Sequence, residues 1–319
     1  MADTHHSGAL LAIGEVHTAL LRSSAALSVA ASEKLVSLAG GERVRRFERP
    51  IAHVVSPLIL TGVDCRPATV NGAKARIVGT VAGHASITGG HVVQGTATTR
   101  IAPSRSTRRL GWAYYLARPG WVELIGRAST DDLASGFLGC SGDADVLDLG
   151  AIGSRLIGDV QSAPVLDGGL PFRVERTRLR WVARPAAAEP SAQFRVERDG
   201  MRTLVVRGDV AVASAAEFAA DVALHDWLLS ALIRIVDRSR VGIDDRTSVV
   251  QRLRPAVEHL LHLWMPAARG DEAAAALWTG LERRPGLARQ WDALVNRVRD
   301  QLALGAIAAL SDRLGETVP

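Results

Sequence analysis

An acid and a histidine lie one helical turn apart in the segment DVALHDWLLSALI, residues 221–233. On a helix, the spacing i, i+4 brings Asp221 and His225 to one face, where their side chains can hydrogen-bond. A carboxylate that orients an imidazole is typical of a general base, but it equally satisfies a histidine buried in a core. The surrounding apolar residues recur with helical spacing, at Phe218, Val222, Leu229, Leu232 and Val236. This seam favours a buried structural pair, while Asp221 and His225 stay the candidates for a catalytic acid/base pair.

Two further histidines lie in the segment VEHLLHLW, residues 257–264. The zinc motif H-E-x-x-H places two histidines four residues apart, whereas His259 and His262 are three apart and Glu258 precedes both. The apolar residues of this segment lie on another face of the predicted helix, so both histidines are expected to face solvent or another domain. They are candidates for a partner interface. The sequence also lacks the glycine-rich nucleotide-binding motifs, so neither a metal nor a cofactor is predicted.

Arginines are concentrated in two stretches that begin alike, FRVERTRLRWVAR from Phe172 and FRVERDGMRTLVVRG from Phe194. Arginines with aromatic side chains between them are typical of single-stranded nucleic-acid binding. Acidic residues such as Glu175 and Glu197 lie among them, however, and cross-strand ion pairs explain the arginines equally well. Both interpretations stay open. The nucleic-acid-binding candidates are Arg173, Arg176, Arg178, Arg180, Arg195, Arg198 and Arg202.

The elements that must position these residues begin with a β-rich region. A Gly89-Gly90 pair separates two runs of β-branched residues within residues 73–101, which predicts a hairpin. Asp199-Gly200 predicts a second hairpin turn. The two arginine-rich stretches are expected to form edge-like strands.

Past residue 208 the apolar residues follow a helical period instead. Ser214 and Glu217 match the S-x-x-E capping box at the start of the first predicted helix. The sequence therefore predicts an α+β fold. An N-terminal antiparallel β-sheet region with short helices spans residues 1–210, and a C-terminal all-helical bundle of about four helices spans residues 211–319.

Composition limits the classes of function. The chain has 319 residues, is 47% hydrophobic and carries a net charge of +5. All but two of its 38 basic residues are arginines, since only Lys34 and Lys74 are lysines, and such a skew is typical of GC-rich coding sequence. The basic charge is therefore weak evidence for nucleic acid. Only Cys65 and Cys140 are cysteines, and no apolar run reaches the length of a membrane span. We expect a cytoplasmic protein with no signal peptide and no membrane partner.

Several unusual strings resemble an uncharacterised actinobacterial family over nearly the whole chain. They are FERPIAHVVSPLILTGVDC, LGWAYYLARPGWVELIGR, LHDWLLSALIRIVDRSR, LRPAVEHLLHLWMP and RQWDALVNRVRDQLAL. In that family the gene lies beside genes for a variant P-loop protein and a methyltransferase-like protein. The resemblance implies a cytoplasmic component of a multi-gene system, and it implies no activity.

The leading hypothesis is a non-catalytic interaction or assembly subunit that binds a protein partner, such as a neighbouring NTP-binding P-loop protein. Two alternatives stay open: a nucleic-acid-binding module that uses the arginine-rich strands 172–207, and an enzyme that uses Asp221 and His225. Assembly into a homo-oligomer also stays open.

Overall fold

The computed structural model describes residues 9–38, 43–139, 145–186, 189–241, 243–268 and 271–316. Cys140 lies outside these residues. A ten-stranded sheet and a set of helices confirm the predicted α+β class. The strands are β1 (Leu11–Leu20), β2 (Arg45–Phe47), β3 (His53–Val55), β4 (Ile59–Cys65), β5 (Arg76–Thr88), β6 (Val92–Pro103), β7 (Trp121–Ile125), β8 (Thr177–Arg184), β9 (Ser191–Val196) and β10 (Arg202–Arg207).

The strands follow the order β2-β3-β5-β7-β6-β1-β8-β10-β9, with β4 also paired to β5. The predicted hairpin is present, because Gly89 and Gly90 join β5 to β6 with φ angles of +57° and +67°. Further along, β7 inserts between the two strands, parallel to β6 and antiparallel to β5. Gly79 permits this approach, since a Cβ there would lie 2.1 Å from the Trp121 carbonyl oxygen. Pairing of β8 with β10 is also parallel, so the sheet is mixed rather than purely antiparallel.

The first arginine-rich stretch is not an edge strand. β8 lies inside the sheet between β1 and β10, and Trp181 at its centre is fully buried. Of the described strands that the two arginine-rich stretches form, β9 from the second stretch lies at an edge of the sheet. The predicted turn at Asp199-Gly200 does connect β9 to β10, with Gly200 at φ +81°. The arginines of the first stretch suggested an edge strand. In the structure two of them, Arg178 and Arg180, pair with Glu15 on the neighbouring strand β1 instead.

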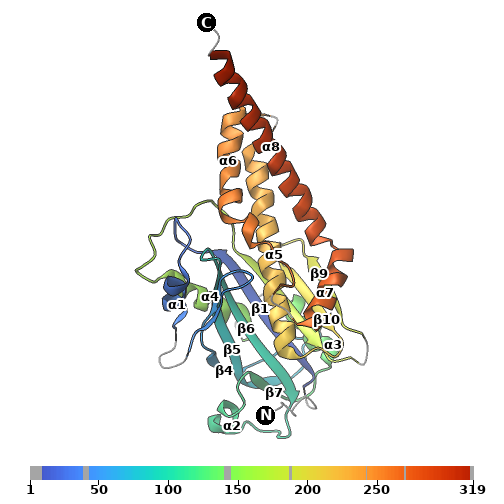
Figure 1. The fold of residues 1–319 in the computed structure, drawn as a ribbon. Coiled ribbons are helices and arrows are strands. Elements are labelled where there is room, and N and C mark those ends of the chain that lie inside the picture. Colours follow the sequence, from blue (N-terminus) through green and yellow to red (C-terminus); the bar gives the residue numbers. More distant parts are fainter. Residues whose placement is uncertain are drawn as a thin grey trace.

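Helices cover both faces of the sheet (Figure 1). Alternate residues of β1 divide between two hydrophobic clusters, with Leu11 and Ile13 in one and Ala12 and Val16 in the other. The first cluster includes residues of α1 (Val29–Val36), α3 (Thr130–Gly139) and α4 (Leu149–Gln161). The second includes residues of α5 (Val212–Ser239) and of the helices that follow it. The short helix α2 (Trp112–Leu116) precedes β7.

The predicted four C-terminal helices are α5, α6 (Arg246–His259), α7 (Glu272–Arg283) and α8 (Leu287–Glu316), with a 3-10 turn at Leu261–Leu263. In Figure 1, α5, α6 and α8 project together beyond the sheet. The lower part of α5 packs on β1, β6 and β8, so one hydrophobic cluster spans the predicted boundary at residues 210/211. None of the helices in the described ranges is both long and apolar enough to cross a membrane.

The capping-box prediction was wrong. Ala211 is the N-cap of α5 and Ser214 lies within the first turn. Instead of capping its own helix, the Ser214 hydroxyl donates to Asp271 at 2.6 Å, next to the start of α7. The Ser214 side chain, which the local motif predicted as the helix cap, therefore forms a hydrogen bond with a segment that is distant in the sequence.

Candidate binding cleft

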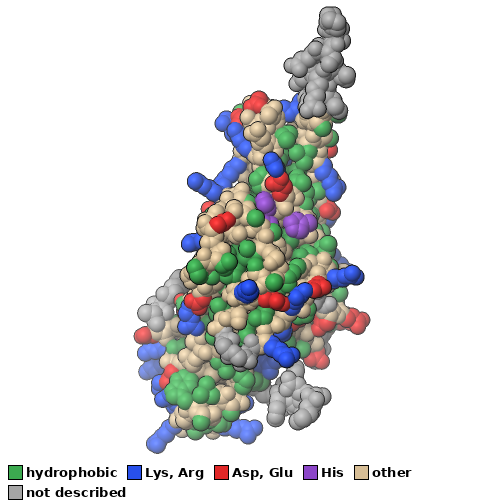
Figure 2. All heavy atoms as spheres, turned by 60° about the vertical axis from the view of Figure 1, so that its left-hand side comes forward, with side chains coloured by type: hydrophobic (Ala, Val, Ile, Leu, Met, Phe, Trp, Pro, Cys, Tyr) green, Lys and Arg blue, Asp and Glu red, His purple; other side chains and the backbone are tan. Residues whose placement is uncertain are grey.

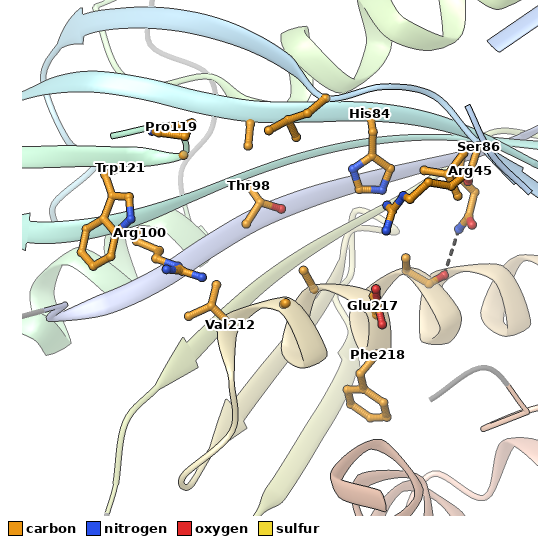
Figure 3. Close-up of a pocket in the computed structure, with 18 of the residues that line it drawn as sticks. Arg45, His84, Ser86, Thr98, Arg100, Pro119, Trp121, Val212, Glu217 and Phe218 are labelled. Carbon is orange, nitrogen blue, oxygen red and sulfur yellow. Dashed lines mark hydrogen bonds between the residues drawn. The ribbon is translucent and has the colours of Figure 1, made fainter. Parts of the chain in front are cut away.

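A cleft of about 1530 Å³ lies between the sheet and the N-terminal half of α5 (Figure 3). Strands β2, β3, β5, β6 and β7 provide one wall, and α5 with part of α7 provides the other. Ala213, Ala216 and Ala220 are the α5 residues that leave this space open, because their side chains are too short to reach the sheet. Elsewhere on the same helix, larger side chains such as Trp227 fill the gap to the sheet.

The sheet wall of the cleft is polar, although a sheet face that packs beneath a helix is usually apolar. His84 and Ser86 on β5, with Gln94 and Thr98 on β6, project from alternate positions into this space. The Gln94 amide donates to the Thr18 hydroxyl at 3.1 Å and to the Ala220 carbonyl at 2.9 Å. The buried Thr98 hydroxyl has no hydrogen-bond partner among the described residues. Burying such groups without partners costs free energy, so the wall is suited to a polar ligand.

His84 is neutral at pH 7. Burial, followed by the positive charge of Arg45, lowers its pKa from 6.5 to about 4. Figure 3 shows the imidazole projecting from β5 into the cleft, close to the Arg45 side chain. No hydrogen bond to the ring is formed within the part of the chain that the structure describes. His84 can therefore both donate and accept a proton in hydrogen bonds with a ligand.

Four arginines that line the cleft have no carboxylate partner among the described residues: Arg45, Arg49, Arg100 and Arg105. Arg100 lies over the Trp121 ring, 5.2 Å from its centroid, which fixes the guanidinium while its N–H groups stay available. Of the three carboxylates in the lining, Glu123 and Asp221 are already hydrogen-bonded. The Glu217 carboxylate is exposed and unpaired in the described chain. The cleft therefore carries an excess of positive charge.

One rim of the cleft is formed by α2 and the residues around it. Glu123 accepts hydrogen bonds from the Tyr114 hydroxyl at 2.6 Å, from Arg118 at 2.8 Å and from Ser104 at 2.9 Å. The hydrogen bond to Glu123 raises the pKa of Tyr114. These bonds fix α2 against β7, so the rim has a defined shape.

The outer side of this rim is apolar and exposed. Its large side chains are Leu110, Trp112, Tyr114 and Leu116, which we call the α2 rim. Arg109 packs over Trp112 at 4.8 Å. Figure 2 shows hydrophobic side chains with basic ones around them at the lower end of the molecule, where Figure 1 places α2.

Asp221 and His225 are brought together, but differently from the prediction. His225 is 1% exposed, and its Nδ1–H donates to the backbone carbonyl of Asp221 at 2.7 Å, whereas the carboxylate is 3.4 Å away. Its Nε2 accepts from the Met265 amide at 3.2 Å. The carboxylate instead accepts from the Trp278 indole at 2.9 Å and from the Ala267 amide at 3.1 Å. His225 is not among the residues that line the cleft and has the surroundings of a core residue, whereas Asp221 does line the cleft.

The two candidate interface histidines differ in their surroundings. His259 lies at the junction of α6 and the sheet, where its Nδ1 is 3.2 Å from Nε2 of His91, the residue that follows the β5–β6 turn. His262 is exposed. An interface role for His259 and His262 stays a prediction, although His259 is partly covered by its own chain.

The arginines of the predicted nucleic-acid-binding surface differ in their surroundings, because some pair with buried carboxylates and others are exposed to solvent. Two arginines donate to the buried Glu15 carboxylate, Arg178 through its Nε at 2.9 Å and Arg180 through its Nε at 3.0 Å. Burial alone would raise the pKa of Glu15, but the His17 hydrogen bond and the charges of Arg180 and Arg178 outweigh it and lower the pKa to about 2. These ion pairs join β8 to β1 through Glu15, and not through the acidic residues that lie among the arginines, since Glu175 pairs with Arg234 on α5.

Among the other nucleic-acid-binding candidates, two arginines have partners within the protein and three are exposed to solvent. Arg202 pairs with the buried Asp226 at 2.7 Å, while Arg176 donates to Ser154 at 2.9 Å. Burial raises the pKa of Asp226, although Arg202 opposes this effect. Arg173, Arg195 and Arg198 are exposed.

Sequence analysis missed the residues that form the cleft, above all Arg45, His84 and Arg100. A signal was present, because polar residues alternate on β5 and β6 at the positions that face α5. Period-2 polarity usually marks a solvated face, and only the structure shows a helix above it. Comparison of the chain with family models, with curated proteins and with solved structures gives no match.

Proposed function

We propose that this chain is a non-catalytic interaction subunit whose cleft receives an extended acidic segment of a partner protein. The observation that carries the proposal is the set of arginines described above, which face one cleft without carboxylate partners in the described chain. Positive charge that is not neutralised within a protein attracts an acidic partner and directs its approach.

The size of the cleft supports a segment of a macromolecule rather than a small ligand. Pockets for small molecules usually enclose about 300–1,000 Å³, whereas this cleft encloses about 1530 Å³. Arg45 and Arg105 both line the cleft and are both exposed, so the cleft is open to solvent beside each of them. A segment of a partner protein can reach the cleft past these exposed arginines.

Binding is favoured over catalysis by the surroundings of His84. A general base needs a second group that orients its ring and fixes its tautomer. The imidazole of His84 forms no hydrogen bond with any described residue, and the better-oriented His225 is enclosed in the core. The α2 rim adds a second contact surface, because tryptophan, tyrosine and arginine are the residues that dominate binding energy at protein interfaces.

The first test measures binding of a fluorescein-labelled peptide of alternating glutamate and serine by fluorescence anisotropy. The double variant Arg45→Glu/Arg100→Glu reverses two charges in the cleft and should weaken binding at least tenfold, about 1.4 kcal/mol. Its matched control is Arg195→Glu/Arg198→Glu on the β9–β10 hairpin, which changes the net charge equally but lies outside the cleft. Equal loss in both variants, or no binding by the wild-type chain at low salt, would refute the proposal.

A second candidate function, nucleic-acid binding, is favoured by the exposed Arg195 and Arg198 and is tested with the same variants. A single-stranded oligonucleotide replaces the peptide as the probe. If nucleic acid is the ligand, the hairpin variant should lose affinity for the oligonucleotide, and the affinity of the wild-type chain should fall steeply with salt. Binding of the peptide but not the oligonucleotide leaves the first proposal standing alone.

A further inference from the structure

One corner of the cleft collects hydrogen-bonding groups from neighbouring strands. The register of the sheet aligns Arg45 on β2 with Val55 on β3, Val55 with Ser86 on β5, and Ser86 with Gln94 on β6. His84 lies two residues before Ser86 on the same strand and projects from the same face. Figure 3 shows Arg45, His84 and Ser86 at one end of the cleft, with Arg100 and Trp121 at the other.

Ser86 is the most enclosed member of this corner. The residue is 5% exposed and lines the cleft, and its hydroxyl forms no hydrogen bond with another described residue. The hydroxyl is not among the fully buried polar atoms that lack a partner, so it is accessible from the cleft. The same strand shows the usual outcome nearby, since Thr80 and Thr88 each have hydrogen-bond partners. The Ser86 hydroxyl, in contrast, is available to a ligand group in the cleft.

The charges around the corner define the chemistry of that group. Arg45 is a cation without a carboxylate partner, and it is near enough to His84 for its charge to lower the pKa of the imidazole. Glu217 on α5 lies across the cleft from Arg45 (Figure 3), but no ion pair joins them. A guanidinium, an imidazole N–H and a hydroxyl can all donate to the oxygens of one anion.

We propose that Arg45, His84 and Ser86 form an oxyanion-binding subsite, which takes one carboxylate or phosphate group of the ligand. The subsite rests on the proposed function only in using the same cleft, because small anions can test it without a partner segment. Arg45 provides the charge, and Ser86 and His84 fix the position of the oxygens. The alanines of α5 opposite leave room for the group that bears the anion.

The test is an NMR titration of the full chain with ¹³C,¹⁵N-labelled histidine, in which His84→Gln assigns the His84 resonance. Sodium phosphate or sodium acetate is added at pH 7 against sodium chloride of equal ionic strength. The His84 resonance should shift and saturate with the oxyanion but not with chloride. Arg45→Gln should weaken this binding about tenfold and Ser86→Ala about threefold, while Arg195→Gln should leave it unchanged.

The two anions distinguish the sources of the oxyanion. Tighter binding of phosphate indicates a phosphorylated ligand, and tighter binding of acetate indicates a carboxylate. A His84 shift that is equal in chloride, or one that Arg45→Gln leaves intact, overturns the subsite. Saturable anion binding by a chain that does not bind the acidic peptide would retain the subsite and reject the partner segment. Peptide binding that is unaffected by Arg45→Gln and Ser86→Ala would retain the partner segment and reject the subsite.

Discussion

At the scale of single residues, burial alone does not determine how a polar side chain is used. Glu15 and Ser86 are both buried on the sheet. Glu15 is surrounded by His17, Arg178 and Arg180, which hold it as a carboxylate, whereas the hydroxyl of Ser86 lacks a partner in the described chain. The hydrogen bonds of Glu15 are used within the protein, whereas the Ser86 hydroxyl faces the cleft and is available to a ligand.

The Asp221–His225 pair gives a prediction at the same scale. The Asp221 carboxylate accepts from two donors other than His225, the Ala267 amide and the Trp278 indole, so the loss of His225 does not leave it without partners. His225→Leu instead removes the acceptor of the Met265 amide, so it should cost about 1–3 kcal/mol. Asp221→Ala should cost more, because it leaves two donors unpaired.

Urea-induced unfolding of the two variants measures this difference. Both hydrogen bonds are accepted by Oδ2 of Asp221. Asp221→Asn is the matched control, since its carbonyl oxygen has two lone pairs and can accept both, and its stability should fall between those of Asp221→Ala and the wild type. A larger loss for His225→Leu than for Asp221→Ala would show that the imidazole, and not the carboxylate, holds these segments together.

At the scale of elements, the periodicity of apolar residues predicts whether most segments are helices or strands, but it does not predict which elements lie next to them. The β5–β6 hairpin and the four C-terminal helices follow from local patterns. The interior place of β8 does not, because it depends on a carboxylate of β1, which is distant in the sequence. Ser214 is a similar case, since its partner Asp271 lies 57 residues away.

The cleft itself follows from small residues that sequence analysis cannot distinguish from ordinary helix formers. Ala216 on α5 is partly exposed and lines the cleft. Ala216→Trp should fill the space and abolish binding of the acidic peptide without altering any charge. Because the new side chain enters an existing cavity, the free energy of unfolding should change by no more than about 0.5 kcal/mol.

The matched control for this prediction is Ala276→Trp, on an exposed position of α7 outside the cleft. Anisotropy measures peptide binding and urea-induced unfolding measures stability for both variants. Unchanged peptide binding by a stable Ala216→Trp protein would place the binding surface elsewhere.

At the scale of the whole molecule, the projecting helices and the sheet meet at a cluster of histidines. His91 is buried, and burial together with the charges of His259 and His262 lowers its pKa from 6.5 to about 4. The unfolded chain therefore binds more protons than the folded chain between these pH values. Stability is fully present above about pH 6.5 and falls as the pH drops toward 4.

For His91 alone, the loss between pH 6.5 and pH 5 should be about 2 kcal/mol. Urea-induced unfolding at both pH values measures it, and His91→Asn should flatten the dependence. His84→Asn is needed as a parallel variant, because the pKa of His84 is lowered to about the same value. The Glu258 carboxylate, 3.9 Å from His259, opposes the effect at that neighbour. An unchanged slope in His91→Asn would remove this histidine as a source of acid sensitivity.

The central place of β1 has a consequence for synthesis on the ribosome. This almost entirely buried strand emerges long before β6 and β8, the two strands that flank it. Until then it is an apolar segment that can pair with other nascent chains. Glu15 interrupts the segment with a charge, which opposes such pairing. Arg178 and Arg180, 163 and 165 residues further along, neutralise that charge only when the correct neighbouring strand arrives. We therefore expect the Glu15 charge to oppose wrong pairing of the nascent chain, and the carboxylate is buried once the sheet is complete.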